Sequence, residues 1–239
     1  MKTLLESAIE ARGGWERWRE LGQLTAHVSV GGGTLALKGW PGALDDARFV
    51  IDPRRPLTRI QPFGKPGLSA QFEPERTMIV GPDGKPLHSR ERPRQAFAGH
   101  ELATPWDALH LAYFAGYAVW TYLTTPFLFT MPGFQVEELA PWHEGGEAWG
   151  RLQVRFPDTV PSHSPVQTFY FGSDGLLRRH DYSVDVIGGT SSANYASEHR
   201  SFGGIVFPTK RRVFTIGPDQ LPLNDRVILS IDFHDIEVD

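Results

Sequence analysis

Residues 104–126 read TPWDALHLAYFAGYAVWTYLTTP, and no other segment of the chain constrains the architecture as strongly. Its first four residues offer a threonine cap, a proline at the first helical position and an acid in the first turn, which together predict a helix start. We expect the helix to cover 104–125, because Pro126 ends it. Residues 111–134 carry no charge, and apolar side chains cover every side of the helix. A helix of this kind is buried, either in protein or in lipid.

Burial in protein is the better explanation of this helix. A bilayer span needs about 20 predominantly apolar residues, and the stretch approaches that length. It is interrupted by Gly116, Thr121, Pro126 and Pro132, it carries several tyrosine hydroxyls, and amphipathic strands flank it. We therefore expect no membrane span and predict that a curved sheet surrounds the helix.

The N-terminal third predicts two short helices followed by a β meander. Residues 1–22 place Trp15 and Trp18 on one helical face, within helices expected over Leu4–Arg12 and Trp15–Leu21. In the meander, 23–80, apolar residues alternate and turn residues separate the runs. The strands are expected at Leu24–Val30, Thr34–Lys38 (a hairpin across Gly31–Gly33), Ala47–Ile51, Leu57–Gln61, Leu68–Phe72 and Thr77–Val80. The charged segment His88–Arg94 is interpreted as a solvated loop.

Residues 135–239 predict a second β meander. Its strands are expected at Gln135–Leu139, Ala148–Phe156, Val166–Phe171, Gly175–Ile187, Ala193–Phe202, Ile205–Ile216 and Arg226–Val238. No linker or repeat separates the halves, so 1–239 is expected to be a single domain. The predicted fold is mainly β (α+β): a single large curved antiparallel sheet, or open β-barrel, wrapped around the central apolar helix, with short N-terminal helices.

Composition excludes several functions. The net charge is only −4 and basic residues are scattered among acidic ones, which argues against nucleic-acid binding. The absence of cysteine removes disulfides, thiol catalysis and cysteine-based zinc sites. No His-x-x-x-His spacing occurs, so we expect no metal and no cofactor. The first residues lack the apolar core of a secretory signal, so we expect a cytoplasmic protein.

Strand 175–187 carries the most suggestive polar residues. Side chains alternate across a strand, so Arg178, His180 and Tyr182 share the core face. If Val184 lies opposite Tyr195, then His180 lies opposite His199, and two imidazoles meet on the inner wall. An inward Arg178 needs an acidic partner, such as Glu137 or Glu198, or an anionic ligand.

These residues suggest a catalytic set and a wider ligand-binding set. Histidine titrates near neutral pH, so His180 and His199 are candidates for general acid and base, with Arg178 or Tyr117 orienting a carboxylate or carbonyl. The candidate ligand-binding residues are His110, Tyr113, Phe114, Trp120, His163, Tyr182 and Tyr195. The alternative for each histidine is a structural hydrogen bond within the wall, and for the aromatic residues plain core packing.

The order of elements, together with residues 174–179 (DGLLRR) and 202–209 (FGGIVFPT), resembles the lipoprotein-carrier fold of the LolA/LolB type. That resemblance implies an open β-barrel whose helices plug a hydrophobic cavity for acyl chains. This sequence lacks the family's export signal and lipidated cysteine, so the resemblance implies the fold of a cytoplasmic relative without implying lipoprotein transport.

Two functions remain open at this point. The favoured one is a cytoplasmic binding protein for a hydrophobic or aromatic small molecule, held between the sheet and the central helix. The alternative is a cofactor-independent hydrolase, lyase or isomerase that uses His180 and His199 in the same cavity.

Overall fold

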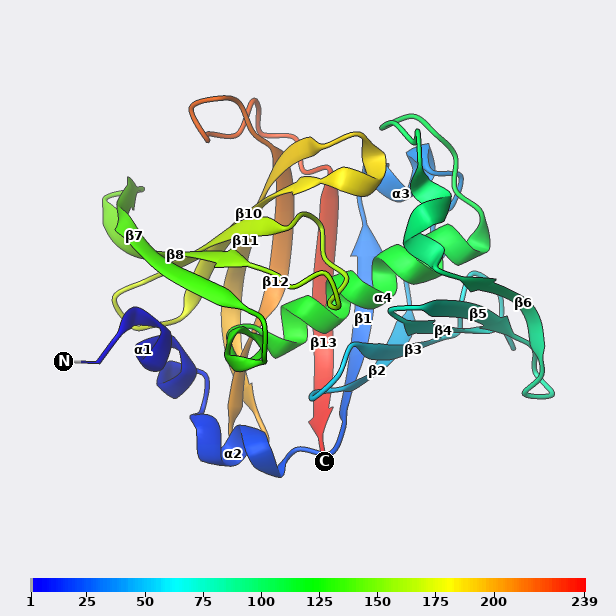
Figure 1. Ribbon diagram of the computed structural model, residues 1–239, viewed down its shortest axis with the longest axis horizontal. Coiled ribbons are helices and arrows are strands. Elements are labelled where there is room, and N and C mark those ends of the chain that lie inside the picture. The colour runs from blue at the N-terminus through cyan, green and yellow to red at the C-terminus, as the bar shows by residue number, and fades with distance from the viewer. Residues whose placement is uncertain (1) are drawn as a thin grey trace.

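The computed structural model describes residues 2–239 and contains one 13-stranded antiparallel sheet (Figure 1). The strands are β1 (Leu24–Gly31), β2 (Ala47–Asp52), β3 (Leu57–Gln61), β4 (Ser69–Glu73), β5 (Arg76–Val80), β6 (Pro86–Glu91), β7 (Gln135–Glu144), β8 (Glu147–Arg155), β9 (Val166–Phe171), β10 (Leu177–Val184), β11 (Thr190–Phe202), β12 (Ile205–Thr215) and β13 (Leu229–Val238). The α-helices are α1 (Leu4–Ala11), α2 (Trp15–Glu20), α3 (Gly33–Leu37) and α4 (Ala108–Thr124), and the 3-10 helices are η1 (Pro93–Phe97), η2 (Phe127–Thr130) and η3 (Asp185–Ile187).

The sheet is built from two meanders, which are joined where the first strand of the chain, β1, pairs with the last, β13. Its order is β6-β5-β4-β3-β2-β1-β13-β12-β11-β10-β9-β8-β7. Strand β1 pairs with β13 from Leu24 opposite Val238 to Gly31 opposite Ser230. The order ends at β6 and β7 without closing, so the sheet is open. The predicted mainly β fold, with one curved antiparallel sheet around an apolar helix, is confirmed.

Helix α4 crosses the concave side of the sheet in front of β1 and β13 (Figure 1). Every residue from Leu109 to Thr124 is buried. The helix packs most closely where it lacks a side chain: a Cβ at Gly116 would lie 2.4 Å from Cβ of Phe72 on β4, and Thr58 Oγ1 donates to the Gly116 carbonyl at 3.0 Å. Within residues 2–239, no helix combines the length and apolarity that crossing a bilayer requires.

The predicted start of this helix is wrong by one turn. Asp107, not Thr104, is the N-cap, and its carboxylate accepts from the backbone N–H of His110 at 2.9 Å. The preceding segment is held in a non-helical form because the Lys38 ammonium donates to the carbonyls of Glu101, Leu102 and Thr104 at 2.7–3.1 Å. Those carbonyls are therefore occupied by a distant residue that the local pattern does not reveal.

Two further predictions are wrong. Residues 34–37 form most of α3 and Lys38 is its C-cap, in place of the second strand of a hairpin, because Gly32 has a positive φ (99°) and the Thr34 hydroxyl donates to the Ile228 carbonyl at 2.7 Å. The charged segment from His88 begins in the edge strand β6, not in a loop. Charged residues suit an exposed edge strand, since they discourage pairing with other chains. The remaining predicted strands are present: Leu57–Gln61 and Val166–Phe171 have the predicted bounds, and the others have shifted ends.

Candidate functional site

A cavity of about 700 Å³ opens at one end of α4, between α3, strands β10–β12 and residues 223–229. We call it the ligand cavity. Its walls are mostly apolar, and the apolar side chains are Leu37, Leu102, Trp106, Phe114, Val184, Ile187, Val213, Leu223, Ile228 and Leu229. Tyr182, Thr190, Ser192 and Thr215 contribute hydroxyls from the strands, and Arg226 lies at the exposed rim.

A smaller apolar void of about 30 Å³ adjoins the ligand cavity and shares Phe114 and Leu229 with it. It lies between α4 and strands β1, β2 and β13, where Ala115 and Ala118 present short side chains. Small residues on this face of the helix leave space that larger ones would fill. Phe114 and Leu229 separate the two spaces.

A buried polar cluster lies behind Tyr182, on the side facing α4. The His163 ring stacks on the Tyr182 ring with centroids 4.0 Å apart. Tyr122 Oη lies 3.0 Å from His163 Nε2 and 3.3 Å from the Tyr182 hydroxyl, and Tyr117 Oη lies 3.2 Å from His163 Nδ1. Burial, aided by the positive charge of nearby arginines, lowers the pKa of His163 to about 3. The imidazole is neutral at neutral pH, with both nitrogens hydrogen-bonded.

His180 lies on the same inner face. Its Nε2 is 2.6 Å from Gln167 Oε1, so it donates to the amide oxygen, and its ring stacks on Phe169 with centroids 4.0 Å apart. Burial holds the pKa of His180 well below its ordinary value. This ring is a neutral hydrogen-bonding group of the wall.

The predicted pairing of His180 with His199 is wrong. In the observed register His180 lies opposite Asn194, and Val184 lies opposite Thr190. The connection folds as the compact helix η3, so β11 begins earlier than the predicted loop allowed. His199 instead lies opposite Pro208, and burial together with Arg178 lowers its pKa to about 4. The two imidazoles do not form an acid–base pair.

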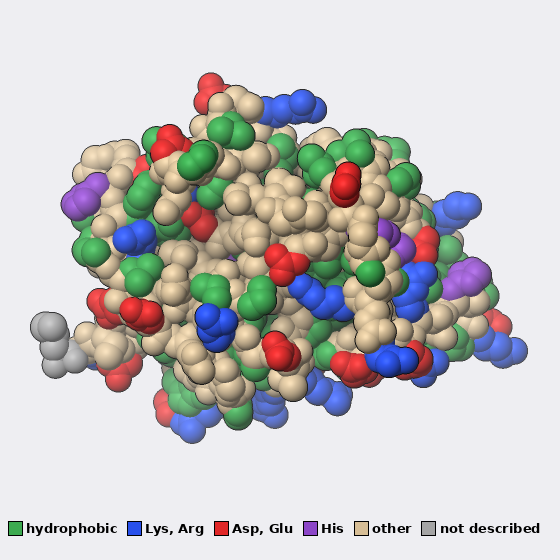
Figure 2. Space-filling model, turned by 45° about the horizontal axis from the view of Figure 1, so that its top comes forward, with side chains coloured by type: hydrophobic (Ala, Val, Ile, Leu, Met, Phe, Trp, Pro, Cys, Tyr) green, Lys and Arg blue, Asp and Glu red, His purple; other side chains and the backbone are tan. Residues whose placement is uncertain are grey.

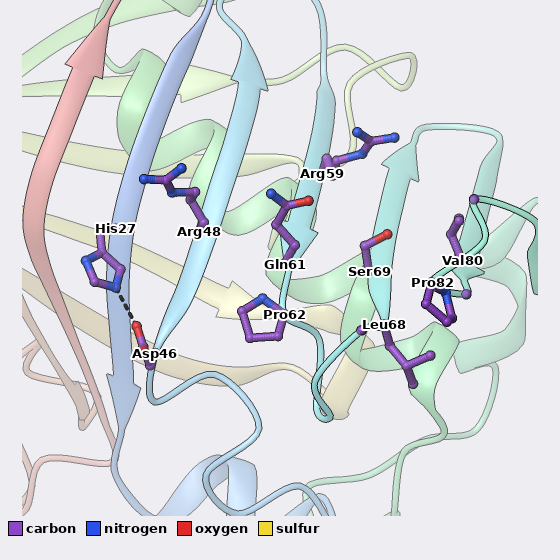
Figure 3. A pocket seen from close by; sticks show the side chains of 13 residues that line it. His27, Asp46, Arg48, Arg59, Gln61, Pro62, Leu68, Ser69, Val80 and Pro82 are labelled. Atoms are coloured by element: carbon purple, nitrogen blue, oxygen red, sulfur yellow. Dashed lines mark hydrogen bonds and ion pairs between the residues drawn. The ribbon is translucent and has the colours of Figure 1, made fainter.

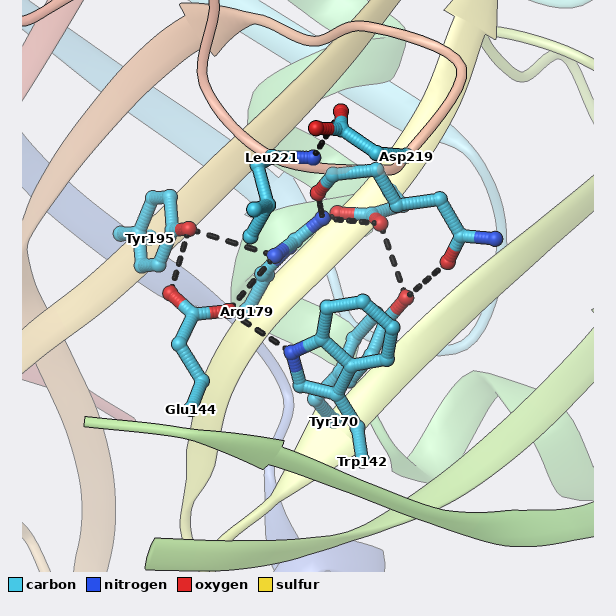
Figure 4. Close-up of polar contacts among 9 residues, drawn as sticks. Trp142, Glu144, Tyr170, Arg179, Tyr195, Asp219 and Leu221 are labelled. Atoms are coloured by element: carbon cyan, nitrogen blue, oxygen red, sulfur yellow. Dashed lines mark hydrogen bonds and ion pairs between the residues drawn. The ribbon is translucent and has the colours of Figure 1, made fainter. Parts of the chain in front are cut away.

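Arg178 and Tyr195 do not face the cavity either. A register irregularity between Leu177 and Arg179 turns Arg178 outward, where it pairs with Asp174 at 2.7 Å. Arg179 is the buried arginine of this strand (Figure 4). On the outer face it bonds the carboxylates of Asp181 and Glu144 at 2.7 Å, the Tyr195 hydroxyl at 3.2 Å and the Gln220 carbonyl. The cluster ties residues 217–228, which reach the cavity rim, to the sheet.

Three other predicted ligand-binding residues are buried away from the ligand cavity. His110 bonds around the helix start, with Nε2 3.2 Å from the Ala96 carbonyl. Tyr113 packs edge-on against Phe72 with centroids 5.5 Å apart, and Trp120 donates to the Asp52 carbonyl at 2.8 Å. Of the seven predicted residues, the cavity lining contains Phe114 and Tyr182. His163 stands directly behind Tyr182.

The sequence analysis missed the inner faces of β11 and β12. Ser192 and Val213 line the ligand cavity, and Asn194 and Arg211 continue the same face beyond it. Strand alternation indicates these residues once the register is known, because Ser192, Asn194 and Ala196 are spaced by two. The predicted loop between β10 and β11 was too long, so the register of β11 was wrong and these residues were not recognised.

A second hollow, of about 690 Å³, is an open groove on the outer face of β1–β5 (Figure 3). Arg48, Arg59, Gln61 and Ser69 rise from neighbouring strands there, and His27 pairs with Asp46. Exposed charged side chains on a sheet face are normally solvated, and such pairs contribute little to stability. The groove does not share the apolar character of the ligand cavity.

Charged side chains of both signs are interspersed over the face shown in Figure 2. Lys and Arg do not gather into one patch on this face, and Asp and Glu lie among them. A surface of this kind does not favour a strongly charged partner.

Comparison with known proteins assigns the fold. No protein-family model matches the sequence, and a search of curated proteins gave no match. Among solved structures, a LolA superfamily protein from Nitrosomonas europaea is similar with a TM-score of 0.53 and 12% identity over 99% of this chain and 92% of that one. A DUF1329 family protein from Desulfovibrio piger gives 0.55 and 12% over 99% and 92%. A putative outer membrane lipoprotein-sorting protein domain from Vibrio parahaemolyticus gives 0.54 and 10% over 98% and 91%.

These similarities extend over nearly the whole chain, so the LolA-like fold predicted from the sequence is confirmed. At such low identities the similarity establishes the architecture, an open sheet around a helix, and does not identify a ligand.

Proposed function

We propose that this protein binds a hydrophobic small molecule in the ligand cavity. The observation that carries the proposal is the mostly apolar hollow of about 700 Å³ beside α4. Small-molecule sites typically measure about 300–1,000 Å³, with apolar walls and a few polar groups that fix orientation. Here the polar groups are the side chains of Thr34, Tyr182, Thr190, Ser192, Thr215 and Asn224, with Arg226 at the rim.

Exposed apolar side chains support the same conclusion. At the mouth of the cavity Leu37, Leu102 and Leu223 are 47%, 46% and 61% exposed, and contiguous exposed apolar surface marks ligand or interaction sites. The neighbouring core is tight, since Gly116 and Phe72 leave no space even for a methyl group. A large hollow next to such a tightly packed helix contact indicates a binding site for a ligand.

The enzymatic alternative depends on His180 and His199 lying opposite each other. The observed register separates these two residues. We therefore advance the binding function alone.

The proposal is tested by filling the cavity. Ser192→Phe places a large ring in the lining, whereas Ser191→Phe places the same ring on the exposed opposite face of β11. Binding is measured as the fluorescence of the neutral apolar probe N-phenyl-1-naphthylamine. We expect wild type and Ser191→Phe to bind it with similar affinity, and Ser192→Phe to bind about tenfold more weakly or worse.

Circular dichroism melts establish that both variants fold. Absence of probe binding by the wild type, or equal affinity in folded Ser192→Phe, would overturn the proposal. Native mass spectrometry of freshly purified protein gives a second readout, in which a retained lipid or apolar metabolite is expected.

A further inference from the structure

The inner face of β11 and β12 changes character just beyond the ligand cavity. Tyr182 lies opposite Ser192, and both line the cavity together with Val213. One step further along the same face, His180 lies opposite Asn194, which itself pairs with Val213 on β12. The next inward residue of β12 is Arg211, opposite Ala196. Polar side chains therefore come next on the inner face of these strands, directly beyond the ligand cavity.

These polar groups lack partners. Asn194 and Arg211 are 0% and 1% exposed. Within residues 2–239, Nε and Nη1 of Arg211 have no hydrogen-bond partner, and neither amide atom of Asn194 has one in good geometry, although the amide lies near the Tyr122 and Tyr182 hydroxyls. Leaving buried polar atoms unpaired destabilises the fold, and an unpaired charged group costs more than a neutral one. Such groups indicate that something absent here completes their hydrogen bonds.

Arg211 is the more unusual of the two, because it is a buried cation. Its guanidinium lies over the Tyr122 ring, 4.4 Å from the centroid, and Nη2 reaches the Tyr122 carbonyl at 3.4 Å. No carboxylate in residues 2–239 pairs with it. Burial lowers its pKa to about 10, so it remains protonated at neutral pH.

A second buried guanidinium reinforces the positive charge at the C-terminal end of α4, where the Tyr122 carbonyl lies. Arg12, at the end of α1, is 2% exposed and donates from Nη2 to the Leu123 carbonyl at 3.0 Å. Its Nε and Nη1 have no partner in the described chain. The negative end of the helix dipole stabilises both cations in part. Two carbonyls do not compensate two whole charges, so an anion is still favoured beside them.

We propose that Arg211 and Asn194 receive the carboxylate of an amphiphilic ligand whose hydrocarbon chain occupies the ligand cavity. This inference rests on the proposed binding function and adds the chemical class and orientation of the ligand. The two carboxylate oxygens accept from the guanidinium fork and the Asn194 amide, which satisfies the unpartnered donors. A small planar head group suits two fully buried partners better than a bulky phosphate ester. The ligand is a long-chain carboxylic acid bound head first.

The opposite orientation has its own candidate residue, which gives a matched control. Arg226 also lines the cavity but is exposed at the rim, so it would hold the carboxylate of a ligand bound chain first. The experiment compares oleic acid with oleyl alcohol, which has the same chain and an uncharged end. Affinities are measured by displacement of N-phenyl-1-naphthylamine from wild type, Arg211→Met and Arg226→Met.

We expect the wild type to bind the acid about tenfold or more tightly than the alcohol. In Arg211→Met this preference should fall to about one while the alcohol affinity is kept, and in Arg226→Met it should be unchanged. Methionine removes an unpaired buried cation at similar length, so the unliganded variant is expected to melt no lower than wild type. Asn194→Leu, which keeps side-chain volume, provides the same test should Arg211→Met fail to fold.

The outcomes separate this inference from the binding function. Equal affinity of the wild type for acid and alcohol, or loss of the preference in Arg226→Met rather than Arg211→Met, overturns the head-first carboxylate site and leaves apolar binding intact. Failure of the wild type to bind the probe or either lipid overturns the proposed function itself.

Discussion

Three histidines on or near the inner wall are held neutral by their surroundings. Burial is the largest cause in each case, lowering the pKa of His163 to about 3 and of His199 to about 4, and placing that of His180 well below its ordinary range. In the unfolded chain the same side chains titrate near pH 6.5. Acidification therefore adds protons to the unfolded state before it adds them to the folded one.

This difference predicts a loss of stability on the acid side. Because the unfolded state binds more protons below about pH 6.5, the free energy of unfolding should fall as pH decreases toward about 4. His163 alone contributes about 1.4 kcal/mol per pH unit. His163→Gln keeps hydrogen bonding to Tyr117 and Tyr122 but cannot be protonated, so its stability should depend less steeply on pH.

The measurement is urea denaturation between pH 7 and pH 4. The control is His143→Gln, which changes an exposed histidine on the β7–β8 hairpin and should keep the wild-type slope. Identical slopes for wild type and His163→Gln would contradict the assignment of His163 as a buried neutral group.

Residue-level prediction from the sequence succeeded where it depended on apolar character and failed where it depended on register. Phe114 was predicted to bind ligand because it lies in the uncharged helix, and Tyr182 because alternation along its strand puts it on the core face; both line the cavity. Arg178 left the predicted inner face because of one irregularity in β10, which alternation alone does not reveal. The unpartnered Arg211 was missed, since its isolation is visible only when three strands are assembled.

At the scale of elements, the packing of α4 against β4 depends on a missing side chain. A Cβ at Gly116 would lie 2.4 Å from the Phe72 Cβ, a distance that real contacts do not reach. Gly116→Ala should therefore destabilise the protein by about 1–3 kcal/mol, although alanine favours helices. Urea denaturation of Gly116→Ala measures the loss.

A double-mutant cycle with Phe72→Ala supplies the control. With the ring removed, the added methyl group should cost little or become favourable. An equal cost of Gly116→Ala in both backgrounds would show that the contact with Phe72 is not its origin.

Elements whose ends depend on long-range bonds were the hardest to predict. The α4 stretch was recognisable because its composition demands burial, but its first turn is displaced by Lys38, which is distant in sequence. Helix α3 likewise depends on the Ile228 carbonyl. Strand β6 looked like a loop because it is exposed along its length. At the starts of α4 and α3, local propensity was overridden by a partner distant in sequence, whereas β6 pairs with its hairpin neighbour β5.

At the scale of the whole molecule, two features of the sequence predicted an open sheet around one helix. Apolar and polar residues alternate in both halves of the chain, and an uncharged helical segment lies between the halves. The pairing of β1 with β13 and the deep contacts of α4 join the two meanders. We therefore predict a single cooperative unfolding transition. Far-UV circular dichroism and tryptophan fluorescence should report the same midpoint in urea, and two separate midpoints would show that the meanders unfold independently.

The seam between β1 and β13 has a consequence for biosynthesis. Translation proceeds from the N-terminus, so β1 leaves the ribosome some 200 residues before the strand it must pair with. Throughout that interval the first meander of the nascent chain exposes the unpaired edge of β1 and an apolar concave surface. We expect the growing chain to engage a holding chaperone until its last strand emerges.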